Sequence, residues 1–213
     1  VGAFGTSAGT VDYSKVTTDF TTNFEDAVSP ATAGYTITGI NSPTALPRFG
    51  DIPAADGTYY YDVPGIALSG AVAQKLDISA GMDVVIRITA AAGTKGVSVT
   101  GNASINVLAG GSLEMYTEAD VSIAGGGIAN SNDPEAFMFY STRVASASGS
   151  QSVSIRGNGQ LSAVVYAPNS NVTMNGGGAS GHVYGAVVAD NISVTGGSEF
   201  HYDESLASRT TGN

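Results

Sequence analysis

The chain has 213 residues, with 42% apolar and 12% charged side chains, 29 glycines and no cysteine. Its net charge of −10 and its lack of a basic cluster argue against nucleic acid and anionic membranes as partners. The absence of cysteine excludes disulfides and thiolate sites, and no apolar run is long enough for direct membrane insertion. The length predicts a single domain, residues 1–213, and the charge-poor surface rich in Gly, Ser, Thr and Asn favours a bacterial exterior.

The first part of the chain predicts an extension followed by a helix. It starts at VGAFGTSAGT without an initiator Met, which predicts a processed form or an excised domain. Residues 1–13 are interpreted as an N-terminal extension and residues 14–29 as an amphipathic α-helix that ends before Pro30. The apolar stripe of this helix recurs every four residues: Val16, Phe20, Phe24 and Val28. Threonines are poor helix formers, so we expect the helix to depend on packing.

The remainder of the chain divides into two regions and a tail. Residues 30–75 form a Pro-rich irregular region in which we expect only short strands: YTITGI (35–40), TYYYDV (58–63) and IALSGAV (66–72). From residue 76 to 206, apolar and polar residues alternate in segments of five to eight residues. Gly, Asn or Asp separates most of these segments, which is typical of strands joined by turns. Residues 207–213 predict a flexible tail.

Several of these segments repeat. DVSIAGGG (120–127) aligns with NVTMNGGG (171–178) at an offset of 51, and the latter aligns with NISVTGG (191–197) at an offset of 20. INVLAGGSL (105–113) aligns with VSIRGNGQL (153–161) at an offset of 48, and SAVVYA aligns with GAVVA at an offset of about 22. Spacings of roughly 20 to 25 residues, and their doubles, are what one coil of a parallel β-helix uses.

The predicted fold is therefore all-β, a parallel β-helix (solenoid) with an N-terminal capping α-helix. The alternative is a β-sandwich, which needs tight hairpins, yet Asn-Gly and Asp-Gly turns are scarce. A β-helix has open ends that need covers. We expect Phe20 and Phe24 of the helix to cover one end, and Phe200, His201 and Tyr202 of FHYDESLA (200–207) to cover the other.

Three segments in the second half carry a resemblance to known proteins. They are DPEAFMFYS (133–141), GNGQLSAVVYAPNSNVTMNGG (157–177) and GHVYGAVVADNISVTGGSEFHYDESL (181–206). Together they resemble exported bacterial β-helix domains of type IV pilus-associated proteins and of "choice-of-anchor" adhesin-like surface proteins. The TTDF segment (17–20) is similar to the helix of the latter group. The resemblance implies a right-handed, exported module and offers no catalytic residue to carry over.

An enzyme of the polysaccharide lyase or hydrolase type has to be weighed, because such enzymes also use β-helices. Their chemistry needs clustered carboxylates on neighbouring coils. The repeated coils contain few acids, and Asp120 and Asp190 stand alone at turns. The sequence therefore predicts a protein that is not an enzyme and that uses no cofactor.

The two histidines, His182 and His201, have no metal-ligating partner at i+2 or i+4. His201 lies among three acidic residues that offer a carboxylate–histidine site: Glu199, Asp203 and Glu204. We prefer an end cap, with Phe200 and Tyr202 tucked in and His201 hydrogen-bonded. No metal is expected there.

Two other segments offer candidate ligand contacts. The NSNDPEA loop collects oxygen ligands at a spacing that matches no calcium loop, so a turn is the preferred interpretation; the candidates are Asn130, Asn132, Asp133 and Glu135. In TYYYDV the alternation puts Tyr59 and Tyr61 opposite Tyr60. An exposed tyrosine there can contact a ligand, although covering the side of the solenoid is the preferred role.

These features favour a non-enzymatic structural or adhesive module of the bacterial cell surface or pilus, extracellular in location. The rigid β-helix would present the loops of residues 30–75 and 128–150 to an extracellular protein or glycan, or to other envelope or pilus subunits. The alternative is a self-assembling β-helix scaffold whose coils stack end to end. A carbohydrate-active enzyme is retained only if three or more carboxylates converge in a groove.

Overall fold

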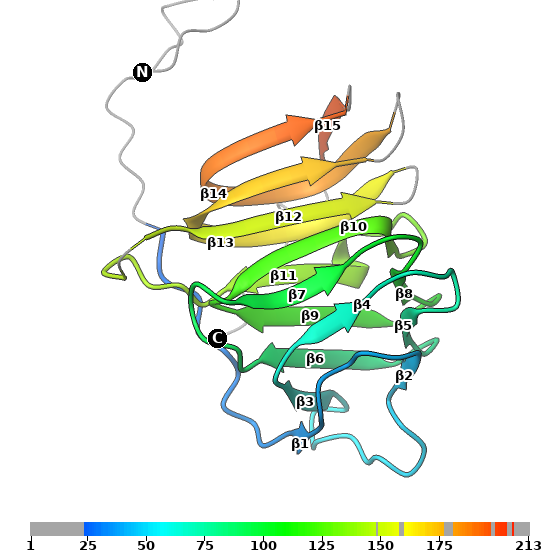
Figure 1. The fold of residues 1–213 in the computed structure, drawn as a ribbon. Helices are drawn as coiled ribbons and strands as arrows, with labels where there is room; N and C mark the ends of the chain where they lie inside the picture. Colours follow the sequence, from blue (N-terminus) through cyan, green and yellow to red (C-terminus); the bar gives the residue numbers. More distant parts are fainter. Residues whose placement is uncertain are drawn as a thin grey trace, which may run out of the picture.

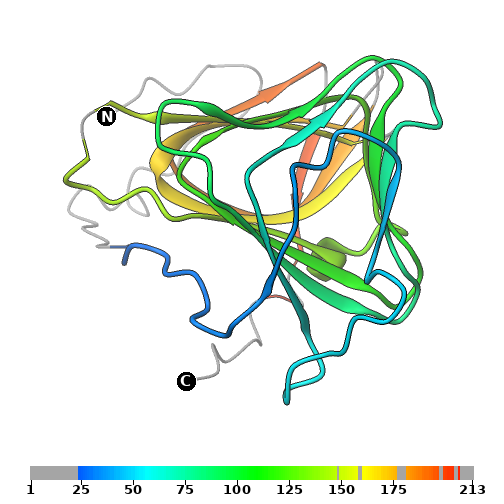
Figure 2. The same ribbon diagram turned by 60° about the horizontal axis from the view of Figure 1, so that its bottom comes forward.

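The structure is a computed structural model, and it shows a parallel β-helix whose coils wind around one apolar core (Figure 1). It describes residues 24–147, 149–157, 160–176, 181–196, 199–203 and 206. Every strand pair in this part of the chain is parallel, which excludes the β-sandwich and its antiparallel hairpins. Figure 2 shows the chain circling the core along three sides.

Each side of the solenoid is a ladder of parallel strands. The first sheet contains β1 (Tyr35–Thr36), β3 (Tyr59–Val63), β6 (Asp83–Ile88), β9 (Ser112–Thr117), β11 (Phe137–Ser141), the first parts of β13 (Leu161–Asn175) and β14 (His182–Thr195), and β15 (Glu199–Tyr202). The second contains β4 (Ile66–Leu68), β7 (Lys95–Val99), the start of β10 (Asp120–Ala129), β12 (Gln151–Gly157) and the later parts of β13 and β14. The third contains β2 (Thr44–Leu46), β5 (Lys75–Ile78), β8 (Ser104–Val107) and the end of β10.

The pairing register confirms most of the predicted repeat. Val121 pairs with Val153, which pairs with Val172, so two coils span the offset of 51. Val172 pairs with Ile192, at the offset of 20, and Val165 pairs with Val187, at the offset of 22. The repeats in the sequence are therefore successive coils of the solenoid.

The predicted alignment of residues 105–113 with 153–161, at an offset of 48, is wrong. Ile105 pairs with Ile128, which pairs with Gly157, whereas Val153 lies on the second sheet and Ile105 on the third. All three sheets share the same alternation of apolar and polar residues, so a sequence alignment can match a strand of one sheet to a strand of another. The coils also begin before residue 76, because β1–β4 in the Pro-rich region already pair with later strands.

The core consists of inward side chains that stack in register from coil to coil. On the first sheet one such ladder is at most 1% exposed: Tyr61, Ile86, Met115, Phe139 and Val165. A matching ladder on the second sheet is at most 2% exposed: Ile66, Val97, Val121, Val153 and Val172. Each buried side chain contributes about 1.5–3 kcal/mol relative to an exposed one, so stacked ladders of this kind are a major source of stability.

The corners between sheets need residues without a side chain. Gly101 and Gly125 lie at the corner between the second and third sheets, with φ of 67° and 65°. A Cβ atom on Gly125 would collide with the carbonyl oxygen of Gly101. Only glycine combines this left-handed backbone with such a close approach of successive coils.

The predicted capping helix at 14–29 is not formed in the residues that can be described. Residues 24–29 have no regular secondary structure, and residues 14–23, with Phe20, lie outside the described residues. Phe24 packs its ring edge-on against Tyr166, whose hydroxyl donates to the carbonyl of Glu25. These contacts hold the segment along the side of the solenoid, and Phe24 and Val28 stay 47% and 83% exposed. In the described part of the chain, no helix is long and apolar enough to cross a membrane.

The first coil is closed by the loop that follows β2, through the carboxylate of Asp51. This carboxylate accepts hydrogen bonds from the Tyr61 hydroxyl at 2.7 Å and from Arg48 Nε at 3.0 Å. The Arg48 guanidinium also lies 5.6 Å from the ring centroid of Tyr35. Burial tends to raise the pKa of Asp51, but the hydrogen bonds from Arg48 and Tyr61 outweigh it and hold this pKa below its usual 3.8.

Replacing Phe139 by alanine is expected to lower the free energy of unfolding by about 3–5 kcal/mol, because it removes one rung of a fully buried ladder. The matched control is Phe49→Ala, since Phe49 is fully exposed, and it should change stability by less than about 0.5 kcal/mol. Urea unfolding followed by circular dichroism measures both. Equal effects of the two substitutions would contradict the stacked core.

Replacing Asp51 by asparagine is expected to cost about 1–3 kcal/mol at pH 7, since it removes a charged acceptor from Arg48 and Tyr61. Because the folded pKa is lowered, the contribution is complete above the unfolded value of 3.8 and is lost as pH falls through the folded value. Urea unfolding at pH 7 and below pH 3.8 gives the free energy of unfolding of the unmodified chain and of the variant. The difference between these two free energies should be smaller in acid. If the difference in free energy of unfolding is the same at both pH values, the ionised Asp51 carboxylate does not stabilise the fold as described.

Candidate functional site

The outer side of the first sheet carries a second, smaller apolar cluster. Tyr60, Val85 and Tyr116 are buried there, and Tyr140 packs against them. The Tyr116 and Tyr140 rings stack with centroids 4.8 Å apart and planes 10° apart. The outer side of this sheet is thus a packed surface, on which polar groups can be held in fixed positions.

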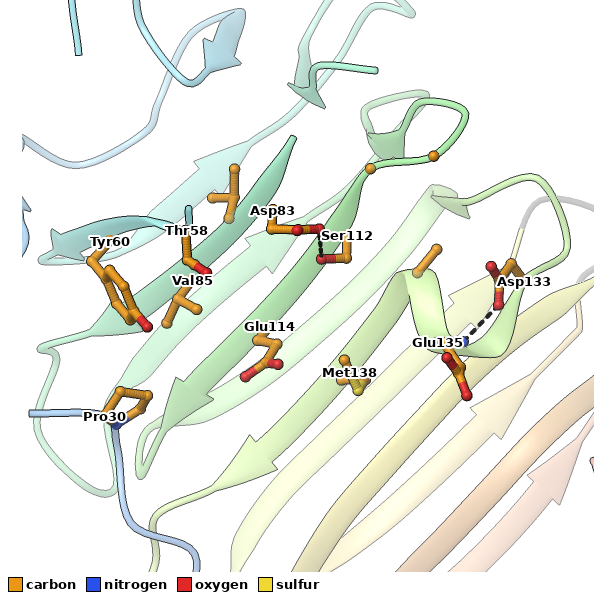
Figure 3. Close-up of a pocket in the computed structure, with 14 residues that line it drawn as sticks. Pro30, Thr58, Tyr60, Asp83, Val85, Ser112, Glu114, Asp133, Glu135 and Met138 are labelled. Atoms are coloured by element: carbon orange, nitrogen blue, oxygen red, sulfur yellow. Dashed lines mark hydrogen bonds between the residues drawn. The ribbon is translucent and has the colours of Figure 1, made fainter. Parts of the chain in front are cut away.

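A groove of about 440 Å³ lies over this surface (Figure 3). Its floor is a row of outward residues that pair across four neighbouring strands: Tyr60 of β3, Val85 of β6, Glu114 of β9 and Met138 of β11. A wall is formed by the 3₁₀ helix η2 (Pro134–Ala136), which precedes β11. The volume lies in the range of small-ligand sites.

Four carboxylates line this groove: Asp83, Glu114, Asp133 and Glu135. None of the described lining residues is basic. Asp83 accepts a hydrogen bond from the Ser112 hydroxyl at 2.6 Å, and Glu114 accepts one from the Tyr116 hydroxyl at 2.8 Å. Burial and the Glu114 carboxylate raise the pKa of Tyr116 well above its ordinary value, so this phenol remains a donor. The groove therefore presents negative charge to whatever enters it.

The groove carboxylates do not form a compact metal-ligand cluster. Among the described residues, the one group of three or more His, Asp or Glu ligands that could hold an ion lies in the last coil. The groove is therefore better suited to accept hydrogen bonds and positive charge from a ligand than to hold a cation of its own.

Of the three tyrosines predicted as ligand contacts, only Tyr60 lines the groove. Tyr61 is fully buried in the main core, where its hydroxyl donates to Asp51, and Tyr59 packs against the same core. The predicted alternation is thus correct, with Tyr59 and Tyr61 inward and Tyr60 outward. An inward tyrosine in a closed coil cannot reach a ligand.

The NSNDPEA loop is a turn held by its own side chains. The buried Asn130 amide donates to the carbonyls of Asp133 and Ser162, each at 2.7 Å. Asn132 adopts a left-handed backbone with φ of 62°, and Asp133 caps η2 by accepting from the Glu135 backbone N–H. These contacts fit the turn that the sequence favours, and they place Asp133 and Glu135 beside the groove rather than around a calcium ion.

The residues expected to cover the far end lie in the last coil, on β14 and β15. The prediction that Phe200 and Tyr202 are tucked in is wrong, because they are 37% and 54% exposed. β15 continues the first sheet beside β14 instead of folding across the end. His201 is hydrogen-bonded, as expected, and its partner is His182: His182 Nδ1 lies 3.0 Å from His201 Nε2, with Glu199 nearby.

Sequence reasoning missed two relationships in these sites. Asp83 and Glu114 line one groove because Val85 and Glu114 pair in register, which appears only when the coils are stacked. His182 and His201 lie one coil apart, since their separation in the sequence is close to that of the paired Val172 and Ile192. A search for ligand pairs at the coil spacing, rather than at i+2 or i+4, would have found the histidine pair.

Comparison with known proteins gives a family but no function. Searches of curated proteins and of solved structures found no match. A family model described as a domain of unknown function, DUF7305, matches residues 5–209. Since that match covers nearly all of the chain, the protein belongs to the DUF7305 family.

Proposed function

We propose that this domain is a non-enzymatic adhesive module of the bacterial cell surface, in which a rigid β-helix presents an acidic groove to a positively charged partner. The observation that carries the proposal is the groove over the first sheet, which four carboxylates from β6, β9 and η2 line without a basic neighbour in its described lining. Extracellular proteins, including other envelope or pilus subunits, are the partners that we expect, through their Lys and Arg side chains.

Electrostatics favours a basic ligand over the alternatives. A cleft lined by one sign of charge concentrates ligands of the opposite sign, and the net charge of −10 adds to the attraction. The hydroxyls of Ser112 and Tyr116 are already used on Asp83 and Glu114, which fixes these carboxylates in place before a ligand arrives. Preorganised acceptors lose little entropy when they bind.

Four carboxylates line one groove, so the condition stated for a carbohydrate-active enzyme is met and that function is retained as a candidate. The arrangement nevertheless supports binding better than catalysis. Acid–base hydrolysis needs two groups whose environments favour opposite protonation states. The described lining residues of the groove include no histidine, lysine or arginine, so such a difference would have to come from burial or from the carboxylates themselves. Rigidity also suits a binding module, since the floor residues lie on hydrogen-bonded strands rather than on loops.

The scaffold alternative rests on the last coil, where four apolar side chains are exposed: Ile192, Val194, Phe200 and Tyr202. End-to-end stacking would bury them against another copy. Sedimentation velocity over a range of concentrations separates the two functions. A monomer at all concentrations favours the adhesive module, and growing filaments favour the scaffold.

The direct test measures binding of a short Lys-rich peptide in low salt by calorimetry. The double variant Glu114→Gln and Glu135→Gln should bind about tenfold more weakly, because two groove charges are removed while polar side chains of similar size remain. High salt should weaken the binding to the unmodified protein, since these charges are accessible to ions.

Two controls make this result specific to the groove. Glu118→Gln neutralises an exposed carboxylate between β9 and β10, outside the groove, and should leave the affinity unchanged. A peptide with Gln in place of Lys should not bind. If the double variant and Glu118→Gln weaken binding equally, only net charge matters and the groove is not the site. If neutral glycans bind and salt does not weaken their binding, the ligand of the groove is a sugar and not a basic protein segment.

A further inference from the structure

Three side chains with metal-binding atoms meet on the outside of the last coil. β14 and β15 pair in parallel with His182 opposite Glu199 and Tyr184 opposite His201. Side chains alternate along a strand, and the intervening Val183 is fully buried in the core. The two histidines and the glutamate therefore share the outer side of the sheet, although His182 and Glu199 stand far apart in the sequence.

The positions of their atoms define a small isosceles triangle. His182 Nδ1 and His201 Nε2 are 3.0 Å apart, and Glu199 Oε2 is 3.8 Å from each of these nitrogens. The point equidistant from the three corners of such a triangle lies about 2.1 Å from each, the usual length of zinc–nitrogen and zinc–carboxylate bonds.

A single hydrogen bond between the rings explains only part of this arrangement. One ring N–H donating to the other ring nitrogen accounts for the separation of 3.0 Å. The Glu199 oxygen is too far from either nitrogen for a hydrogen bond, yet it lies equally far from both. A shared cation would account for all three distances at once, because it attracts the lone pairs of all three groups.

We propose that His182, Glu199 and His201 bind one first-row divalent transition-metal ion, with Zn²⁺ as the reference case. Two imidazoles and one carboxylate form a donor set that suits zinc and disfavours Mg²⁺ and Ca²⁺, which take mainly oxygen ligands. The histidine side chains are 41% and 40% exposed, so an ion reaches the site directly and keeps room for a water ligand.

Tyr184 supports the site by fixing the His201 ring. The two rings stack with centroids 4.7 Å apart and planes 15° apart, and Tyr184 also lies 5.9 Å from the His182 ring. A ring held in this way loses less freedom when it coordinates an ion.

Binding of an ion would also have a structural consequence. β15 pairs with β14 alone in the described structure, and two of the three ligands lie on β15. The metal would therefore fasten the last strand to the coil before it. This role is independent of the acidic groove, whose floor lies on β3, β6, β9 and β11.

The test uses the full chain without an affinity tag, first freed of metal by a chelator. Calorimetric titration with Zn²⁺ is expected to show one site per chain, and Ca²⁺ and Mg²⁺ to show none. Because the chain has only two histidines, NMR can follow both imidazoles, which should shift together and saturate at one equivalent. This measurement needs no variant and so does not depend on a variant's folding.

Variants then assign the ligands. His182→Gln, His201→Gln and Glu199→Gln should each weaken Zn²⁺ binding at least about tenfold, since even groups outside the coordination sphere typically change metal affinity 10- to 100-fold. Glu118→Gln removes a remote carboxylate, so this variant should bind Zn²⁺ as the unmodified chain does. Unchanged affinity in either histidine variant, or imidazoles that shift independently, would overturn the site and leave a plain histidine–histidine hydrogen bond.

Discussion

The stacking of inward apolar side chains between successive coils is the constraint on which the rest of this structure depends. Tyr61, Ile86, Met115, Phe139 and Val165 form one continuous ladder because every strand of the first sheet keeps the same register. A slip of one residue would turn each apolar side chain outward and each polar one into the core. Register is therefore fixed by burial, and the outward positions are fixed with it.

This constraint explains how a chain of simple composition builds distinct surfaces. Outward residues contribute little to the core and can vary, yet the ladder places them at defined positions. The row from Tyr60 through Val85 and Glu114 to Met138 runs across the strands as regularly as the buried ladder beside it. The same rule brings His182 and Glu199 face to face on the last two strands. Both candidate sites are thus consequences of stacking.

The connections at the corners vary in length, whereas the inward residues of the sheets stay in register. Between β11 and β12 the chain makes a longer excursion, and there Gln151 accepts hydrogen bonds from the Ser141 and Ser170 hydroxyls while donating to the carbonyl of Ala119. These buried polar groups satisfy one another at the turn, so the extra residues do not disturb the ladder. Because the corner connections differ in length, the coils contain different numbers of residues, and the repeat in the sequence is irregular.

The parts of the fold that can be predicted from sequence are those encoded locally. Alternation along a strand and glycine at a corner are visible within a few residues, so the coils and the offsets of 51, 20 and 22 are recognisable. The helix at 14–29 is predicted from a local apolar period, whereas the described residues 24–29 are placed by a contact with Tyr166, which is distant in the sequence. Glu114 and His182 cannot be assigned partners, because their neighbours in space are one coil away and coil length varies.

The single pairing of β15 has a mechanical consequence. In the described structure this strand is held by β14 alone, whereas strands in the middle of the stack are held from both sides. A pulling force applied near this end would break hydrogen bonds at one edge only, and the coils would come away one after another rather than all together. For a protein that bears load, such stepwise release dissipates energy at each coil while the remaining solenoid stays folded.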